Sequence, residues 1–447
     1  MMKRTLLLFV SLLLTMVPLT AQTAGTADSL LTNVVSHLVP GHNTLVRPLP
    51  YYGCVHYDRS SLRFSGKREA HDRFNARLDS LLLFHAADVN VWHVGGSHVQ
   101  ADFFSHRLRT DFTEMQPGNI GVRGLLFPFG MAATNWNHNY RIDWTGTWTA
   151  GRNVQRGADE QFDFGLSGIA AATTDSLASL TLVLNVGLTP SWQFSRLRVL
   201  GYAPDEVQMY CVQPRADGVA DTLRATLDTL SMSHVITFDA LCDSATVFIE
   251  AAASGGFTLT GIIPENDLTG FSWYSSGING AALPSWHRCR HLQRDLQVVK
   301  PDLVVFAIGI NDANVPADEF DVEAFKQDYR RLIAKVEAVS PGCAYLFVTN
   351  NDTHRRISRK VRRPNANAIA VQKAFTELAA EYGGAVWDVF DMMGGLGSST
   401  AWRDAGLMAS DLIHFTRTGY ELLGDMLYNA LVEDYMAHPC VSDDTVR

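Results

Sequence analysis

Hydrophobic positions follow two different periods along this chain of 447 residues. At residues 68–113, and again after residue 270, short apolar runs alternate with segments whose apolar side chains recur every three or four residues. The first kind of run is typical of buried strands, and the second of amphipathic helices. Alternation at this length indicates parallel βαβ units. The predicted strands are 89–96, 270–277, 301–309, 343–350 and 384–390, and the predicted helices are 68–86, 99–113, 283–299, 321–339, 366–383 and 417–435.

Between about residue 130 and residue 270 the helical period disappears. Runs rich in Val, Thr, Phe and Trp are separated there by Gly, Asp and Asn turns, which is the pattern of an all-β sandwich. We therefore predict an α/β protein with a three-layer α/β/α domain of flavodoxin-like type and a parallel sheet, interrupted by an inserted β-sandwich. The predicted domains are a leader at 22–85, the α/β/α domain at 86–130 and 270–437, and the insert at 131–269.

The N-terminal residues predict export. "MMKRTLLLFVSLLLTMVPLTAQTA" has Lys3 and Arg4, then an apolar run and small residues, as a secretory signal peptide has. We predict cleavage after residue 21, and because Gln22 follows instead of Cys, we expect no lipoprotein anchor. No later segment offers about 18 uninterrupted apolar residues, so we expect no transmembrane segment in the mature chain.

The net charge bears on whether the chain binds nucleic acid, and the cysteines bear on zinc sites and disulfides. The net charge is −9, and a nucleic-acid-binding protein usually has a basic face, so we expect no nucleic acid. The most basic stretch, "HRRISRKVRRP" at 354–364, is interpreted as a solvated loop or helix end. The six cysteines show no zinc-site spacing. Cys211 and Cys242 are the best candidates for a disulfide, and buried free thiols are an equal alternative.

Residues that could take part in catalysis follow the predicted strands. The carboxyl ends of parallel strands meet at one edge of a sheet, where sites form. The first strand is followed by Ser97, the second by Gly280, the third by Asn311, and the last helix is preceded by "SDLIH" with Asp411 and His414. Each alone is more simply a turn residue or a helix cap. Their joint occurrence, in this order, predicts a site.

These residue types suit acyl transfer. A serine hydroxyl becomes a nucleophile when a neighbouring base takes its proton, and His414 is the candidate base for Ser97. Asp411, three residues before His414, can reach the other imidazole nitrogen and fix the tautomer. The N–H groups of Ser97 and Gly280 and the side-chain amide of Asn311 can bind the oxyanion. The predicted catalytic residues are thus Ser97, Asp411 and His414, with Ser97, Gly280 and Asn311 as the oxyanion hole.

The same residues resemble the SGNH (GDSL-type) esterase superfamily. "GGSH", "GING", "GIND" and "DLIH" are similar to four of its motif blocks and come in the family's order. The resemblance implies a three-layer α/β/α fold and a serine hydrolase that needs no metal and no cofactor. The family usually has Gly-Asp-Ser, and here Gly96 replaces the Asp. The other serine-hydrolase motif, G-x-S-x-G, does not fit, because Val99 stands at its second Gly.

A closer resemblance is to bacterial peptidoglycan O-acetylesterases. It covers "GGSHVQADFFSHRLR", "GLLFPFGMAATN" and "SSGINGA", together with a β insert between the first and second blocks, which is a carbohydrate-binding-like module in that group. The resemblance implies a periplasmic enzyme that removes O-acetyl groups from cell-wall sugars, with an acetylated glycan, peptidoglycan, as its substrate.

Several alternatives stay open at this stage. They are another carbohydrate acetyl esterase, a lipase-type acylhydrolase, an O-acetyltransferase, and an inactive glycan-binding protein. His98 either makes a structural hydrogen bond in the turn or touches the substrate. Five tryptophans belong either to the core or to a platform for sugar rings: Trp136, Trp144, Trp148, Trp192 and Trp273.

Overall fold

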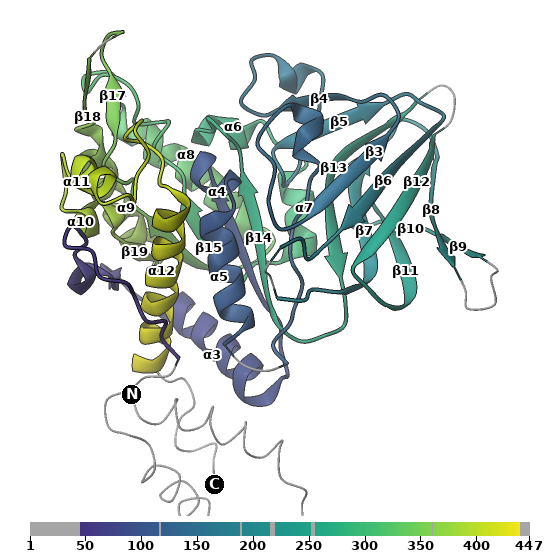
Figure 1. The fold of residues 1–447 in the computed structure, drawn as a ribbon, viewed down its shortest axis with the longest axis horizontal. Coiled ribbons are helices and arrows are strands. Elements are labelled where there is room, and N and C mark those ends of the chain that lie inside the picture. Colours follow the sequence, from purple (N-terminus) through teal and green to yellow (C-terminus); the bar gives the residue numbers. More distant parts are fainter. Residues whose placement is uncertain are drawn as a thin grey trace, which may run out of the picture.

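The structure is a computed structural model that describes residues 45–115, 118–187, 190–214, 220–251, 255–359 and 361–438. The predicted signal peptide lies outside these residues. Figure 1 shows two parts side by side: helices around a central sheet on the left, and a body made mostly of strands on the right.

The central sheet has the predicted parallel strands. β2 (Val89–Gly95), β14 (Phe271–Gly277), β15 (Leu303–Ala307), β16 (Ala344–Val348) and β19 (Ala385–Trp387) run parallel, and β1 (Leu62–Phe64) pairs with β19 antiparallel at one edge. The order is β1-β19-β16-β15-β2-β14. All five carboxyl ends of the parallel strands therefore lie at one edge of the sheet.

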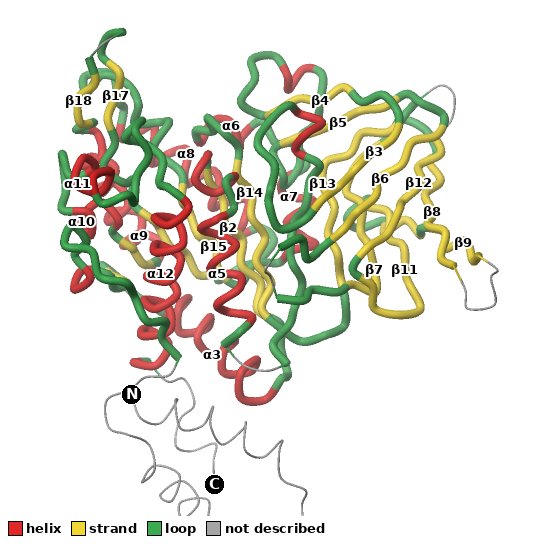
Figure 2. Tube along the Cα trace, viewed as in Figure 1, coloured by secondary structure: helices red, strands yellow, loops and turns green. Residues whose placement is uncertain are grey.

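Helices cover both faces of this sheet. One layer holds α3 (Glu69–Phe84), α5 (Phe103–Thr113) and α12 (Arg417–Ala437), and the other holds α7 (Leu292–Val299), α8 (Val322–Glu337) and α9 (Asn367–Tyr382). Side chains alternate along β15, so that Leu303 and Val305 pack with the first layer and Val304 and Phe306 with the second. Figure 2 shows the strands enclosed by helices in this part. The predicted three-layer α/β/α fold is confirmed.

The described part of the predicted leader belongs to these layers. β1 is the edge strand, and α3 buries the apolar positions that predicted it, namely Phe74, Leu78, Leu81 and Leu82. Residues 62–84 therefore complete the α/β/α core.

Two predicted helices are broken, which corrects the sequence interpretation. The helix predicted at 99–113 is α4 (Ser97–Gln100) followed by α5, because Asp102 between them has a φ of 57°. The helix predicted at 283–299 is α6 (Leu283–His287) followed by α7. At that break the N–H of His291 donates to the carbonyl of Phe164 in the insert. At the first break Asp102 pairs with Arg123 over 2.6 Å, and the local period of apolar residues contains neither this contact nor that of His291.

Short elements fill the remaining connections. They are the 3-10 turns Tyr57–Arg59, Phe129–Ala132 and Ala158–Glu160, the helices α10 (Val389–Met393) and α11 (Ser399–Asp404), and a hairpin of β17 (His354–Arg356) and β18 (Arg362–Pro364). The hairpin corrects the prediction of a loop or helix end at 354–364.

The strands of the insert form two antiparallel sheets. One has the order β10-β11-β7-β13-β5-β4 and the other β3-β6-β12-β8-β9. Their bounds are β3 (Arg141–Thr145), β4 (Thr149–Arg152), β5 (Ile169–Thr173), β6 (Leu177–Val183), β7 (Phe194–Tyr202), β8 (Val207–Pro214), β9 (Ala220–Arg224), β10 (Thr226–Asp228), β11 (Ser233–Cys242), β12 (Ser244–Ala251) and β13 (Phe257–Glu265). An all-β body inserted between β2 and β14 was predicted; the boundaries 131 and 269 stay a prediction.

The insert shares its core with the second helical layer. Buried side chains of both sandwich sheets and of α7, α8 and α9 form one continuous cluster. Polar contacts join the two parts as well: the N–H of Leu166 donates to Asp295 on α7 over 2.9 Å, and Arg288 donates to the carbonyl of Asn153 over 3.0 Å. The sandwich is thus fixed against the α/β/α part.

The predicted disulfide is not present. Cys211 and Cys242 are both free thiols, and Cys440 lies outside the described residues. Cys211 is buried in the sandwich, and burial, with Cys242 nearby, raises the pKa of its thiol to about 12. The alternative of free thiols therefore holds for this pair. Across the described ranges, no helix has the length and the apolar character needed to cross a membrane.

Candidate active site

Ser97 stands at the turn between the first strand and the first helix of the α/β/α part. β2 ends at Gly95, Gly96 precedes the helix, and Ser97 is the first residue of α4. The Oγ of Ser97 lies 2.8 Å from the Nε2 of His414. This is hydrogen-bond distance across 317 residues of sequence, and it places the serine hydroxyl against an imidazole that can accept its proton.

His414 and Asp411 lie in the loop before α12. The Nδ1 of His414 is 2.7 Å from the Oδ2 of Asp411, and the Oδ1 of Asp411 accepts the N–H groups of Ile413 and His414. Burial raises the pKa of Asp411, but these hydrogen bonds outweigh it, so that the pKa lies below its usual value. The carboxylate is therefore ionised at neutral pH. Leu412 has a φ of 57°, which closes this tight loop.

The candidate oxyanion donors belong to segments that meet at the turn before Ser97, where a Cβ on Gly96 would lie near the Nδ2 of Asn311 and the carbonyl of Ala281. Gly280 has a φ of 83°, a conformation that favours glycine, and its backbone faces open space. The N–H groups of Ser97 and Gly280 donate to no other described residue. The Nδ2 of Asn311 donates one hydrogen to the carbonyl of Ala281 over 2.9 Å, which orients the amide and leaves its second hydrogen available. These three groups are thus available as donors to an oxyanion.

Gly96 lies directly against Asn311. A Cβ at this position would stand 3.3 Å from the Nδ2 of Asn311, closer than most such contacts. The glycine that replaces the usual aspartate therefore leaves room for the candidate oxyanion amide in its observed position.

The residues that hold the Gly280 turn in place were not predicted from the sequence. The Oε1 of Gln100 accepts the N–H of Asn279 over 2.6 Å, and the Nε2 of Gln100 donates to the Oγ1 of Thr134 over 2.8 Å. The side chain of Asn279 also donates to Thr134. Gln100 and Thr134 are both buried. No motif marks these residues, because their role depends on segments that meet only in the folded chain.

His98 bonds to α12. Its Nδ1 lies 2.7 Å from the hydroxyl of Tyr420, and its ring centroid is 5.4 Å from that of His414. Burial, with the neighbouring His414, lowers the pKa of His98 to about 3, so its ring is neutral at physiological pH. This geometry agrees with the structural alternative for His98.

Asp312 adds an unusual carboxylate next to Asn311. Its Oδ1 accepts the N–H of Leu283 over 3.0 Å, whereas its buried Oδ2 finds no partner among the described residues. Burial raises the pKa of Asp312 to about 6. The residue links the candidate oxyanion loop to the start of α6.

The five tryptophans differ in how far their side chains are exposed to solvent. Trp192 and Trp273 are buried in the core, and Trp144 and Trp148 are partly buried against it. Trp136 alone among the five is exposed, at 62%. Its ring centroid lies 6.5 Å from that of Trp144, and it follows Asn135, whose carbonyl accepts a hydrogen bond from Gln100. The backbone next to the exposed indole is therefore tied, through Gln100, to the Gly280 turn.

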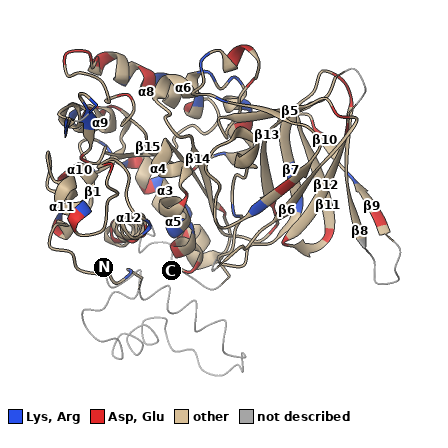
Figure 3. Ribbon diagram, turned by 45° about the horizontal axis from the view of Figure 1, so that its top comes forward, with Lys and Arg blue, Asp and Glu red and all other residues tan. Residues whose placement is uncertain are grey.

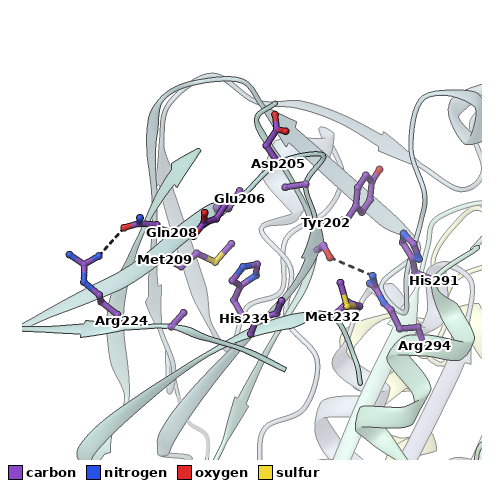
Figure 4. A pocket seen from close by; sticks show the side chains of 15 residues that line it. Tyr202, Asp205, Glu206, Gln208, Met209, Arg224, Met232, His234, His291 and Arg294 are labelled. Carbon is purple, nitrogen blue, oxygen red and sulfur yellow. Dashed lines mark hydrogen bonds between the residues drawn. The ribbon is translucent and has the colours of Figure 1, made fainter. Parts of the chain in front are cut away.

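A cavity of about 930 Å³ lies elsewhere, at one mouth of the β-sandwich. Figure 4 shows Tyr202 and His291 on one wall, Met209 and His234 in the middle, and Gln208 bonded to Arg224 on the other side. None of the five predicted site residues lines it. This cavity is separate from the site around Ser97. Within the part of the chain that the structure describes, no group of three or more His, Cys, Asp or Glu side chains is placed to hold a metal ion.

Comparisons with known proteins agree with this architecture. The sequence profile of the GDSL-like Lipase/Acylhydrolase family matches residues 258–422. No curated protein matches the chain. Among solved structures, a peptidoglycan O-acetylesterase overlaps with a TM-score of 0.66 at 23% identity, covering 84% of this chain and 99% of its own. This overlap shows a shared fold.

Two further solved structures overlap less well. A protein from Bacillus subtilis has a TM-score of 0.33 at 15% identity, with 78% of this chain and 99% of its own covered. A lipase/acylhydrolase from Enterococcus faecalis has a TM-score of 0.29 at 20% identity, with 39% and 80% covered.

Proposed function

We propose that the chain is an ester-hydrolysing enzyme that removes O-acetyl groups from a carbohydrate, with O-acetylated peptidoglycan as its substrate; the match of residues 258–422 to the GDSL-like Lipase/Acylhydrolase family supports this reaction class. The observation that carries the proposed chemistry is the hydrogen-bonded row Ser97–His414–Asp411, with distances of 2.8 and 2.7 Å. The fold shared with a peptidoglycan O-acetylesterase supports the choice of substrate.

The proposed reaction has two steps. The Oγ of Ser97 attacks the acetyl carbonyl while His414 takes its proton, and Asp411 stabilises the imidazolium. The oxyanion is bound by the N–H groups of Ser97 and Gly280 and by Asn311. His414 then protonates the departing sugar hydroxyl, which leaves an acetyl-serine. Water, deprotonated by His414, attacks this ester, and acetate leaves as Ser97 recovers its proton.

Trp136 supports a sugar as the leaving group. An exposed indole offers a flat apolar face, onto which the C–H face of a pyranose ring can stack. Its neighbour Asn135 is tied through Gln100 to the turn of Gly280. In this proposal Trp136 binds a sugar ring of the glycan next to the acetylated position.

The proposal includes export and a periplasmic location. It follows from the predicted signal peptide at 1–21, and it agrees with a cell-wall substrate. Fractionation of cells that produce the full chain tests it: the protein is expected in the periplasmic fraction, with residue 22 as its N-terminus.

The test of the proposed function is acetate release. Wild type and Ser97→Ala are incubated with O-acetylated peptidoglycan and, in parallel, with acetylated xylan and p-nitrophenyl acetate. We expect wild type to release acetate from peptidoglycan, and the variant to release none. Release from xylan but not from peptidoglycan would contradict the substrate and keep the esterase. Acetyl transfer to an added sugar in preference to water would identify an O-acetyltransferase.

A further inference from the structure

The basic stretch at 354–364 forms an exposed hairpin whose charge contrasts with the rest of the molecule. Its described arginines are Arg355, Arg356, Arg359, Arg362 and Arg363, while the whole chain carries a net charge of −9. β17 and β18 project from the α/β/α part near α9 and α11 (Figure 1), and Figure 3 shows blue residues gathered there beside the label of α9. Positive charge is thus concentrated at one place.

The pairing of the two strands places these positive charges where they lower the stability of the hairpin. Arg355 lies opposite Arg363, and Arg356 lies opposite Arg362, so two pairs of like charges face each other across the strands. Like charges in directly opposed positions destabilise a hairpin. None of the five arginines forms an ion pair with a carboxylate of another described residue; the side chain of Arg356 donates to the carbonyls of Ser358 and Arg359. The charge is left for a ligand to balance.

The hairpin is fastened to the loop that carries Asp411 and His414. The N–H of His354 donates to the carbonyl of Leu412 over 3.0 Å, and the guanidinium of Arg362 donates to the carbonyl of Asp411. From the preceding loop, the side chain of Asn351 donates to the carbonyl of Ile413 over 3.0 Å. The hairpin therefore adjoins the loop that carries the candidate base of Ser97.

We propose that this hairpin is a carboxylate-binding subsite, through which the enzyme selects acetylated glycans that carry carboxylates over neutral ones. The inference rests on the proposed function and narrows its substrate. Peptidoglycan carries carboxylates on its peptide stems, whereas an acetylated xylan backbone is neutral. Guanidinium groups bind carboxylates through paired hydrogen bonds, and a cluster of them also raises the local concentration of an anionic substrate.

The test removes charge and keeps the fold. Arg355, Arg359 and Arg363 make no side-chain hydrogen bond with another described residue, so the triple variant R355Q/R359Q/R363Q removes three charges and no such bond; Arg362 is kept because it holds the Asp411 loop. The matched control is R141Q/R156Q/R224Q, which removes the same charge from the β-sandwich. We measure kcat and KM with soluble O-acetylated peptidoglycan fragments, acetylated xylo-oligosaccharides and p-nitrophenyl acetate.

We expect the hairpin variant to raise KM for the peptidoglycan fragments about five- to tenfold at low salt, from three exposed charge pairs. The effect should shrink between ionic strengths of about 0.01 M and about 0.15 M, as the screening length falls from about 30 to about 8 Å. KM for the xylo-oligosaccharides should change less than about twofold, as should all values for the control variant.

The other outcomes contradict the proposal in separable ways. An equal loss on peptidoglycan and xylan, or no loss on either, overturns the carboxylate subsite while the esterase function stands. No acetate release by wild type from either glycan overturns the proposed function itself. If wild type sediments with phosphatidylglycerol vesicles, the triple variant does not, and its kinetics on peptidoglycan are normal, the hairpin is a membrane-surface element and the subsite is wrong.

Discussion

Asp411 illustrates how one side chain serves several bonds at once. One oxygen faces the Nδ1 of His414, and the other accepts two backbone N–H groups of its own loop. The loop is therefore held by the same carboxylate that orients the imidazole. This double use requires the negative charge, and the lowered pKa of Asp411 keeps it ionised.

Asp411→Asn is accordingly expected to lower kcat on the order of a thousandfold, because an amide neither fixes the tautomer of His414 nor stabilises its charged form. The measurement is the hydrolysis rate of p-nitrophenyl acetate, with Asp404→Asn as control, since Asp404 is exposed and pairs with the neighbouring Arg403. A loss smaller than about tenfold would mean that Asp411 does not orient the base.

Asp312 predicts a pH dependence of stability. Its pKa in the folded chain is about 6, above the usual 3.8, so the folded state holds this proton more tightly than the unfolded state does. The free energy of unfolding should therefore fall as the pH rises from about 4 to about 6, by up to about 3 kcal/mol.

The check is urea unfolding across this pH range for wild type and Asp312→Asn. The asparagine keeps an oxygen for the N–H of Leu283 but cannot ionise, so its profile should lack this slope and it should be the more stable protein at neutral pH. Parallel profiles for the two proteins would show that Asp312 is not the titrating group.

Replacement of Trp136 is expected to lower activity on glycans more than activity on a substrate without a sugar ring. Trp136→Ala should lower kcat/KM for acetylated peptidoglycan fragments about five- to tenfold more than for p-nitrophenyl acetate, which carries no sugar ring. Trp136→Phe, which keeps an aromatic face, should restore part of the difference. Tyr51→Ala serves as control, since Tyr51 is the more exposed aromatic and stacks only on Tyr57. Equal losses on both substrates would contradict stacking.

At the scale of elements, the break between α6 and α7 explains how the insert is attached. The chain leaves the helical path there, so that the N–H of His291 reaches Phe164 and Asp295 meets the N–H of Leu166. Asp295 is fully buried and also pairs with Arg294 over 2.8 Å. A buried carboxylate on α7 thus satisfies a backbone donor of the insert and joins two segments that are distant in the sequence.

Asp295→Ala should therefore destabilise the protein by about 3 kcal/mol, because it leaves the N–H of Leu166 and part of the Arg294 charge without a partner. Asp295→Asn keeps one acceptor and should lose less. Thermal unfolding of both variants measures this, and equal stability of wild type and the alanine variant would show that the contact contributes nothing.

At the scale of the whole molecule, the shared core predicts cooperative unfolding. The sandwich and the second helical layer bury one continuous cluster, and a Cβ on Gly168 of the insert would touch Ile278, which follows β14. Neither part can open without exposing apolar surface of the other. We expect a single calorimetric transition whose van't Hoff and calorimetric enthalpies agree. Two resolved transitions would show that the parts unfold separately.

The printed sequence was enough to predict the layers, the order of the strands and helices along the chain, and the candidate residues Ser97, Gly280, Asn311, Asp411 and His414. The reason is that these features are local. A strand or a helix can be predicted from the spacing of its own apolar residues. The candidate residues lie next to the ends of such elements, and sites in parallel sheets form at the carboxyl ends of the strands.

Features that depend on contacts between residues distant in the sequence became visible in the folded chain alone. The tertiary structure broke two predicted helices, left Cys211 and Cys242 as free thiols, and buried Trp192 while exposing Trp136. It also brought Gln100 and Thr134 under the Gly280 turn, and the arginine hairpin onto the Asp411 loop. Each outcome depends on a contact across tens or hundreds of residues, and no local pattern of hydrophobic and polar positions contains that contact.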